Sequence, residues 1–242
     1  FRRKQFDNFI HQFKLKRTKI LEVGCGKGEY LSLLNQLEVD AYGIEYSSKS
    51  VDYSNSKDLN VFKGYIDNAH YKIKHSPFNA FLILSFIEHL PNINDVLRAI
   101  SNNLMDKGVG LIEVPNFDMI LKKNLFSEFI SDHLLYFTKE TLKSTLQYNG
   151  FEIVDCSVVW YDYIISAIVK KSNTYPIIGK IKKLQINNFH NKILQIKYNI
   201  EKYISKFEHK NIVIWGASHQ AFTLLSILNL SSKILFVVDS AP

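Results

Sequence analysis

Cysteine is scarce in this 242-residue chain, which contains only Cys25 and Cys156. The two thiols lack the spacing of a zinc-binding motif, and two cysteines are too few for a disulfide framework. We therefore expect no metal site, and we interpret both cysteines as ordinary small side chains.

Long apolar runs are also absent, since no stretch reaches the roughly eighteen consecutive apolar residues of a membrane span. The opening segment, FRRKQFDNFIHQFKLKR, is basic and aromatic and lacks the apolar centre of a signal peptide. No membrane insertion is predicted, and we expect a cytoplasmic protein. The chain starts without methionine and stops at Pro242, just after an expected strand, so it is predicted to be part of a longer protein.

A net charge of +7, from 30 basic and 23 acidic side chains, fits nucleic acid, a membrane surface or an anionic small substrate as a partner. The lysines are scattered, apart from clusters at 14–19 and 180–183. A solvated basic surface is the simplest interpretation, so the charge by itself does not indicate a nucleic-acid partner.

Strands and helices are predicted to alternate along the first two thirds of the chain. Strands are expected at 19–23, 40–46, 60–63, 79–86, 109–114, 151–158 and 163–170, and helices at 1–16, 29–37, 48–57, 93–105 and 138–148. This alternation predicts an α/β fold with a Rossmann-like, doubly wound parallel sheet that is covered on both faces. Ligands of such sheets bind at the carboxyl ends of the strands.

The pattern changes beyond Pro176. Apolar residues spaced alternately by three and four predict one long helix at 181–207 with a narrow seam: Ile186, Phe189, Ile193, Ile196, Ile200, Tyr203 and Phe207. The seam could form a homodimer or pack against its own domain. The segments NIVIWGASHQAFTLLSIL and KILFVVDS then predict a second strand–helix–strand unit that ends at Asp239. We expect a cofactor-binding domain at 1–175, a helical linker at 176–209 and the start of a second Rossmann-like domain at 210–242.

The segment LEVGCGKGEY, residues 21–30, carries the clearest functional signal. Its three glycines lie between an expected buried strand and an expected helix, where glycine lets the backbone come close to a ligand. The dinucleotide fingerprint would require a glycine at Glu29, and a phosphate loop would require Gly-Lys-Ser/Thr where Gly26, Lys27 and Gly28 stand. Both phosphate-binding interpretations are therefore weakened, and a turn that only connects strand and helix is the other alternative.

The pattern E-x-G-x-G-x-G resembles the first motif of class I S-adenosylmethionine-dependent methyltransferases. This resemblance implies S-adenosyl-L-methionine as the cofactor, with its methionine part beside Glu22, Gly24, Cys25, Gly26 and Gly28. The expected second strand ends at Glu45, which is placed to accept both ribose hydroxyls. Further candidates are Asp67 for the adenine amino group and Phe86 and Ile87 for the pocket wall.

The segment SFIEHLPN, residues 85–92, follows the fourth expected strand. Methyltransferases of amino nitrogens in nucleic-acid bases or glutamine usually carry Asn/Asp-Pro-Pro-aromatic at this place, and this chain does not. Glu88, His89 and Leu90 resemble instead the E-H-L of methyltransferases that act on sugars, lipids and small metabolites. The resemblance favours a small-molecule acceptor over nucleic acid.

A second constellation lies in SEFISDHLLYFTKETL, residues 127–142, where Thr138 is expected to start a helix. The run D-H-L-x-Y-F-T resembles the E-H-L-S-Y-F segment of bacterial deoxysugar C-methyltransferases, whose histidine acts as a general base. The resemblance extends to the C-terminal unit that begins IVIWGAS, whereas the N-terminal zinc-binding segment of that family is lacking. The family's Tyr-His-Glu-His run is represented by Ile130, Ser131, Asp132 and His133, so a phenol that could steady an enolate is missing.

The resemblance implies methyl transfer to a sugar, expected to be nucleotide-linked, in surface-glycan or secondary-metabolite synthesis. An activated methyl sulfonium leaves the enzyme to align the attack and to manage one proton, which is a task for a base. His133 is the first candidate and His89 the second, accompanied by Asp132 and Glu88, although either histidine could instead satisfy a structural hydrogen bond. Two alternatives stay open: an O-methyltransferase of a capsule sugar, phosphate-like group or small metabolite, which Ile130 favours, and a non-catalytic module that binds the cofactor or a sugar nucleotide.

Overall fold

The computed structural model describes residues 1–172, 174, 189–207 and 212–240. The chain divides into two compact units, one of residues 1–116 and 134–181 and the other of 117–133 and 182–242. The segment at 117–133 thus groups with the C-terminal part, although it interrupts the expected domain at 1–175. The expected domain boundaries at residues 175 and 209 stay predictions.

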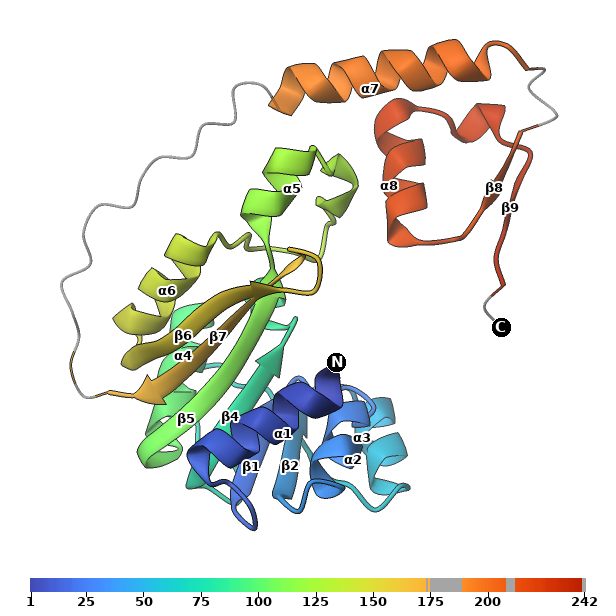
Figure 1. Ribbon diagram of the computed structural model, residues 1–242. Helices are drawn as coiled ribbons and strands as arrows, with labels where there is room; N and C mark the ends of the chain where they lie inside the picture. Colours follow the sequence, from blue (N-terminus) through green and yellow to red (C-terminus); the bar gives the residue numbers. More distant parts are fainter. Residues whose placement is uncertain (173, 175–188, 208–211, 241–242) are drawn as a thin grey trace. The chain divides into compact units, whose positions relative to one another are not determined.

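The first unit is built on a seven-stranded sheet with the order β3-β2-β1-β4-β5-β7-β6 (Figure 1). Its strands are β1 (Lys19–Val23), β2 (Asp40–Glu45), β3 (Asn60–Lys63), β4 (Phe78–Leu84), β5 (Leu104–Pro115), β6 (Phe151–Val159) and β7 (Ile164–Lys171). The strands β1 to β5 pair in parallel, whereas β7 is antiparallel to both of its neighbours, β5 and β6. The doubly wound α/β prediction is confirmed. The expectation of a wholly parallel sheet is wrong for β7, because the short link at 160–163 can join only antiparallel strands.

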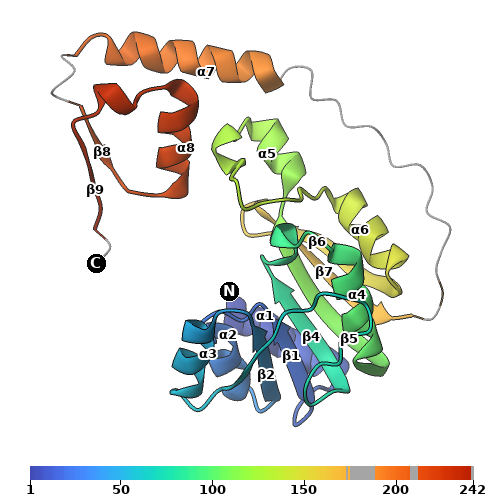
Figure 2. The same ribbon diagram turned by 180° about the vertical axis from the view of Figure 1, so that it is seen from behind.

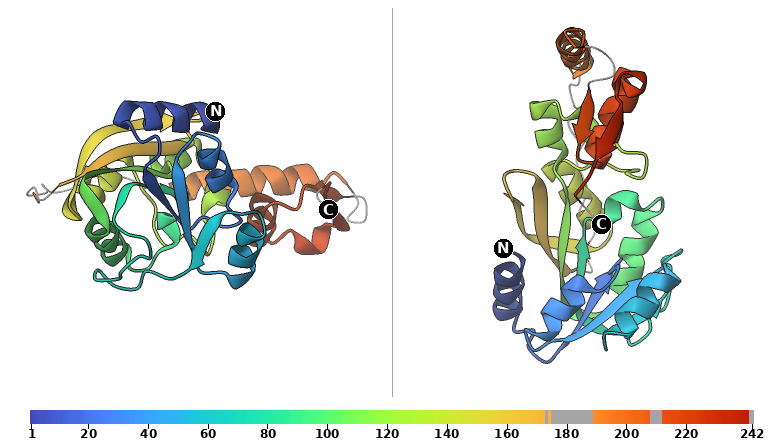
Figure 3. Two further views of the ribbon diagram at one scale, coloured as in Figure 1. Left: turned by 90° about the horizontal axis from the view of Figure 1, so that it is seen from below. Right: turned by 90° about the vertical axis from the view of Figure 1, so that its right-hand side faces the viewer.

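Helices cover both faces of this sheet (Figures 2 and 3). One face carries α1 (Arg2–Phe13), α2 (Glu29–Asn35) and α3 (Ser48–Asn55), and the other carries α4 (Ile93–Asn102) and α6 (Lys139–Tyr148). Phe6 and Leu31 are fully buried on the first face, and Leu142 is fully buried on the second. The central strands are therefore apolar on both sides, as the continuous apolar run in β4 predicts.

Two element ends differ from the predictions for local reasons. The strand β4 ends at Leu84 rather than at 86, because Ser85 adopts a left-handed backbone with φ of 50° and the chain turns into the short helix η1 (Ile87–His89). The helix α4 ends at Asn102, because Asn103 leaves the helical conformation with φ of −100° and ψ of 5°, and its side-chain amide caps the Ala99 carbonyl. The strand β5 can then begin at Leu104, five residues before the predicted start at 109.

The second unit contains the predicted strand–helix–strand segment. Its elements are α5 (Phe117–Lys123), η2 (Phe126–Glu128), α7 (Phe189–Ile204), β8 (Val213–Trp215), α8 (His219–Leu228), η4 (Ser231–Lys233) and β9 (Phe236–Val238). The strands β8 and β9 pair in parallel, and the Gln220 amide of α8 donates a hydrogen bond to the buried Glu128 carboxylate of η2. The helices α5 and η2 were not predicted, although Asp118 in the first turn of α5 and Lys122 and Lys123 in its last turn are typical of a helix.

The described part of the long helix packs within the second unit. Ile200 and Ile204 of α7 contact a small core around Leu225 and Leu228, while Tyr203 stays 62% exposed. Residues 176–188 and 208–209 of the expected linker, which include the seam residue Ile186, lie outside the described residues, as do 210–211 and 241–242. A homodimer through 181–207 stays a prediction. Within the described residues, no helix is long and apolar enough to cross a bilayer.

Candidate active site

The turn between β1 and α2 holds three glycines in the left-handed conformation, with φ of 72° at Gly24, 53° at Gly26 and 76° at Gly28. A Cβ atom at Gly24 would lie 2.5 Å from the Phe86 ring, so the aromatic side chain packs directly on the backbone. At Gly26, by contrast, a Cβ atom would meet no atom within 4 Å. The backbone at Gly26 therefore faces open space, which a ligand can occupy.

Glu45, at the end of β2, is fixed by the backbone of this turn. Its Oε2 atom accepts the Gly26 N–H at 3.0 Å, and its Oε1 atom accepts the Ser47 N–H at 2.8 Å. Each carboxylate oxygen has a second lone pair that remains available to a ligand hydroxyl. Two backbone donors thus orient the acid that was predicted to bind a ribose.

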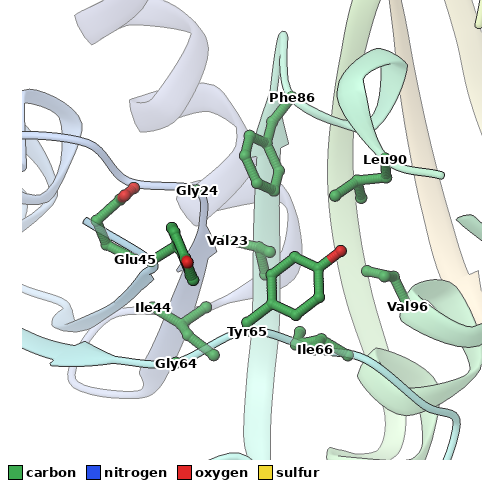
Figure 4. Close-up of a pocket in the computed structure, with 11 residues that line it drawn as sticks. Val23, Gly24, Ile44, Glu45, Gly64, Tyr65, Ile66, Phe86, Leu90 and Val96 are labelled. Carbon is green, nitrogen blue, oxygen red and sulfur yellow. The ribbon is translucent and has the colours of Figure 1, made fainter. Parts of the chain in front are cut away.

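A pocket that we call the glycine-turn pocket opens at the carboxyl ends of β1, β2 and β4 (Figure 4). It contains about 380 Å³ of space free of protein atoms, including open solvent, and is lined by Val23, Gly24, Ile44, Glu45, Tyr46, Gly64, Tyr65, Ile66, Phe86, Leu90 and Val96. Figure 4 shows the rings of Phe86 and Tyr65 between the glycine turn and Leu90. The lining, mainly apolar and aromatic with one carboxylate, is that of a small-molecule site.

The structure brings together some of the expected cofactor residues and separates others. Gly24, Glu45 and Phe86 line the glycine-turn pocket. Ile87 is fully buried in the core on the α4 face and is not among the lining residues. Asp67 is exposed beyond the pocket, where it accepts a hydrogen bond from its neighbour Asn68 at 2.7 Å.

Several lining residues were not predicted, namely Tyr46, Gly64, Tyr65, Ile66, Leu90 and Val96. A signal existed for four of them, because Tyr46 directly follows β2 and 64–66 directly follow β3. The rule that ligands bind at the carboxyl ends of parallel strands could have identified these positions. Leu90 directly follows η1 and Val96 belongs to α4, and the positions of both depend on tertiary packing.

Glu22, near the end of β1, and Cys25, within the glycine turn, are both buried. Burial raises the pKa of the Cys25 thiol, so this side chain stays neutral and is a packing residue rather than a nucleophile. Glu22 is 3% exposed, and burial raises its pKa to about 8, an effect that the nearby Arg2 guanidinium partly opposes. The Glu22 Oε2 atom has no hydrogen-bond partner among the residues that the structure describes. A buried polar atom of this kind would be satisfied by a water molecule or by a donor group of a ligand.

The helix α1 supplies a cation to this buried acidic region. Arg2 forms an ion pair with Glu113 of β5, and the Gln5 amide also donates to Glu113, whose side chain is fully buried. The guanidinium carbon of Arg2 lies 5.1 Å from the centre of the Tyr30 ring in α2. This contact joins α1, α2 and β5 close to Glu22, and the sequence did not reveal it because its partners are 111 positions apart.

The acceptor candidates are distributed over both units. Glu88 is 1% exposed in η1, and its carbonyl oxygen accepts the N–H groups of Leu134 at 2.9 Å and Leu135 at 3.0 Å. The half-buried His89 donates its backbone N–H to the Phe86 carbonyl at 3.1 Å.

His133 and Asp132 belong to the second unit. His133 is half-buried and donates its backbone N–H to Ile130, whereas Asp132 is exposed. The expected helix start is confirmed, since Thr138 and Thr141 form reciprocal side-chain to backbone hydrogen bonds at the start of α6.

A family profile described as "Methyltransferase domain" matches residues 1–155, which is more than half of the chain. The chain belongs to this methyltransferase family. A curated relative, the C-methyltransferase NovU of Streptomyces niveus, is 24% identical over 139 residues, which cover 56% of this chain and 33% of that protein. The chain thus spans about a third of the length of this relative.

Solved methyltransferase structures share the fold. An S-adenosylmethionine-dependent methyltransferase from Clostridium acetobutylicum has a TM-score of 0.59 at 13% identity, over 71% of this chain and 91% of that chain. Magnesium protoporphyrin IX methyltransferase (ChlM) from Synechocystis, with bound S-adenosylhomocysteine, has a TM-score of 0.56 at 14% identity, over 70% and 82%. The plantazolicin methyltransferase BpumL, also bound to S-adenosylhomocysteine, has a TM-score of 0.55 at 15% identity, over 71% and 82%.

The predictions of a class I methyltransferase domain and of S-adenosylmethionine as its cofactor are confirmed. The residues of the domain suit this cofactor. The open face at Gly26 leaves room for a ligand against the backbone. A donor group of the ligand, such as an ammonium, would satisfy the buried Glu22 Oε2 atom. The oriented Glu45 carboxylate is suited to a ribose diol.

Proposed function

We propose that this methyltransferase domain methylates a sugar, carried on a nucleotide, in surface-glycan or secondary-metabolite synthesis. One structural observation supports the acceptor assignment more than any other: the Glu88 carbonyl accepts hydrogen bonds from both Leu134 and Leu135. These bonds join the E-H-L motif to the chain that directly follows His133. The likeness to a C-methyltransferase over 139 residues is consistent with this acceptor class.

In this proposal the cofactor is held by residues of the first unit. The open backbone face at Gly26 and the buried Glu22 hold its methionine part, and Glu45 holds its ribose. Phe86 and Tyr65 supply the aromatic surface of the pocket. When bound, S-adenosylmethionine supplies a methyl group that is activated by the positive charge on sulfur.

The protein's own task is then to orient the acceptor and to remove one proton. His133 takes the proton from the acceptor carbon or hydroxyl, since a neutral imidazole is a competent base near neutral pH. Asp132 and Glu88 are the acids that accompany the two histidines, and His89 donates a hydrogen bond to the acceptor. O-methylation is the second candidate, because Ile130 stands where a phenol would be needed to stabilise an enolate.

The test is methyl transfer to a panel of nucleotide-linked sugars, with mass detection of the product. We expect His133→Ala to reduce turnover at least 100-fold while the affinity for S-adenosylhomocysteine is unchanged, and His89→Ala to have a smaller effect. His11→Ala, at an exposed position on α1, is the matched control. Full activity of His133→Ala would remove the base from the proposal, and a lack of turnover with every sugar would overturn the acceptor class.

A second measurement separates C- from O-methylation. A base that removes a proton from a carbon next to a ketone exchanges that proton with deuterated water even without the methyl donor. Deuterium incorporation into a keto-sugar that His133→Ala abolishes supports C-methylation. A methyl ether in the product, with no exchange, supports O-methylation.

A further inference from the structure

The link between β6 and β7 carries two aromatic side chains that the proposed function does not yet use. Trp160 is 57% exposed and Tyr161 is 91% exposed. Tyr161 therefore makes almost no packing contact within the unit. Its ring does not contribute to the core, although Tyr and Trp are the side chains that bury most area when a ligand covers them.

The backbone of this link is unfavourable for such residues. Trp160, Tyr161 and Asp162 have φ of 53°, 57° and 68°, and the Tyr163 N–H donates to the Trp160 carbonyl at 3.1 Å to close the turn. Turns with positive φ at both central positions prefer Asn and Gly, and a bulky residue there is an outlier. Neither packing nor turn preference explains a tyrosine at 161.

The strained turn is held in place by Asn116, a residue outside it. Asn116, which is 5% exposed at the end of β5, donates its backbone N–H to the Tyr163 carbonyl and its side-chain amide to the Asp162 carbonyl, both at 2.8 Å. Strained backbone persists where its surroundings determine it, and it is concentrated at ligand-binding positions. Asn116 also forms a bridge to Phe137, in the segment that follows His133.

The turn lies at the same edge of the sheet as the glycine-turn pocket. Pro115 at the carboxyl end of β5 pairs with Ile164, so the link at 160–163 projects from the carboxyl edge (Figure 1). Three strand spacings separate β4, which precedes Phe86, from β6. At ~4.8 Å per spacing this is about 14 Å, which is longer than one sugar ring.

We propose that Trp160 and Tyr161 form a stacking platform for the base of a nucleoside diphosphate that carries the acceptor sugar. This inference rests on the proposed function and names the part of the acceptor that lies beyond the sugar. Stacking on aromatic side chains suits a nucleobase, because every base presents a flat π face. The distance of the platform from β4 exceeds one sugar ring, as expected if the ribose and the diphosphate of the nucleotide lie between the base and the acceptor sugar.

Tryptophan fluorescence tests the platform directly. The chain contains two tryptophans, so Trp215→Phe leaves Trp160 as the sole reporter. Titration of this variant with uridine, thymidine and guanosine diphosphates is expected to quench the emission saturably for at least one base. Ribose 5-phosphate and pyrophosphate, which lack a base, are expected to cause no quenching. Equal quenching by these two compounds would overturn the role of the base.

The substitution Tyr161→Asn separates a binding role from a structural one. Asparagine suits the left-handed turn, so we expect an unchanged or higher melting temperature together with at least fivefold weaker binding of the nucleoside diphosphate. Tyr148→Asn, at a tyrosine that is 52% exposed on α6, is the matched control and should leave nucleotide binding unchanged. A lower melting temperature with unchanged nucleotide affinity would show that the ring is structural.

The failures of the two proposals can be told apart with S-adenosylhomocysteine. Binding of S-adenosylhomocysteine without any response of Trp160 to the three nucleoside diphosphates would overturn the platform and leave the methyltransferase function intact. A Trp160 emission spectrum that changes with protein concentration in the absence of nucleotide would assign the two rings to a protein–protein contact. This result would likewise overturn the platform. Saturable quenching together with no methyl transfer to any sugar would overturn the proposed function instead.

Discussion

The Glu45 carboxylate accepts a hydrogen bond from the Gly26 N–H at 3.0 Å, although the two residues are 19 positions apart in the chain. The second oxygen of the same carboxylate accepts the N–H of Ser47. One acid therefore ties the end of β2 to the glycine turn after β1. Because both bonds form within the protein, the turn and the acid are oriented before any ligand binds, which reduces the entropic cost of binding.

The first prediction concerns the open face of the turn. Gly26→Ala places a methyl group in the space at Gly26 and keeps a left-handed backbone with φ of 53°, which costs roughly 1–2 kcal/mol for an L-residue. We expect a loss of unfolding free energy of about this size and at least a tenfold loss of affinity for S-adenosylhomocysteine, measured by urea denaturation and calorimetry. Gly216 in the second unit also has a positive φ, 103°, and open space beside it. Gly216→Ala is therefore the control and should leave the affinity for S-adenosylhomocysteine unchanged. Equal affinities in both variants would contradict a ligand at Gly26.

The second prediction concerns the buried pair that holds α1 to the sheet. Arg2→Ala leaves the fully buried Glu113 without its cation, and loss of one partner of a buried pair costs about 3–5 kcal/mol. Urea denaturation should show this loss. Arg3→Ala, where an exposed arginine donates to the Gln36 side chain, should change the stability by less than about 0.5 kcal/mol. Two variants of equal stability would show that the ion pair does not anchor α1.

The third prediction is a pH dependence of stability that arises from Glu22. Its pKa in the folded protein, about 8, lies above its ordinary value of 4.5, so the folded state holds a proton that the unfolded state releases between these values. The stabilising contribution is therefore complete below about pH 4.5 and is lost as the pH rises through 8. Each unit of difference in pKa corresponds to about 1.4 kcal/mol, so the slope is measurable.

Glu22→Gln isolates this contribution. We expect the free energy of unfolding of the wild type to fall between about pH 5 and pH 8 relative to that of Glu22→Gln. The charged groups that act on Glu22 are Arg2 on α1, which lowers its pKa, and Glu29 on α2, which raises it. Parallel pH profiles of the two proteins would contradict a raised pKa for this carboxyl.

Local sequence signals were sufficient for the central part of the fold. The strand β1 was predicted with its observed bounds because a short apolar run is stopped by Gly24, and β3 likewise ends at Lys63 before Gly64. Apolar residues mark β7 as a strand but do not encode its direction. The four residues between the expected strands at 151–158 and 163–170 were the missed signal, because so short a link joins only antiparallel strands. The helix α5 was not predicted, although Asn116 directly before it, Asp118 in its first turn and Lys122 in its last turn are typical of helix ends.

The candidate site was predictable where residues act through the backbone or directly after a strand. Gly24, Glu45 and Phe86 are of this kind, and all three line the glycine-turn pocket. Ile87 was expected beside them, but the turn after Ser85 directs its side chain into the core. The pairing of Arg2 with Glu113 depends on how α1 crosses the sheet, which no local pattern specifies.

The central claim, a methyltransferase domain whose cofactor is held by the glycine turn and Glu45, is tested most directly by calorimetric titration with S-adenosylmethionine. The account predicts micromolar binding to the wild type, at least a tenfold loss in Glu45→Ala, and unchanged binding in Glu38→Ala, which removes an exposed acid paired with Lys16. Absence of heat and of a thermal shift with the wild type would contradict the account, as would undiminished binding in Glu45→Ala.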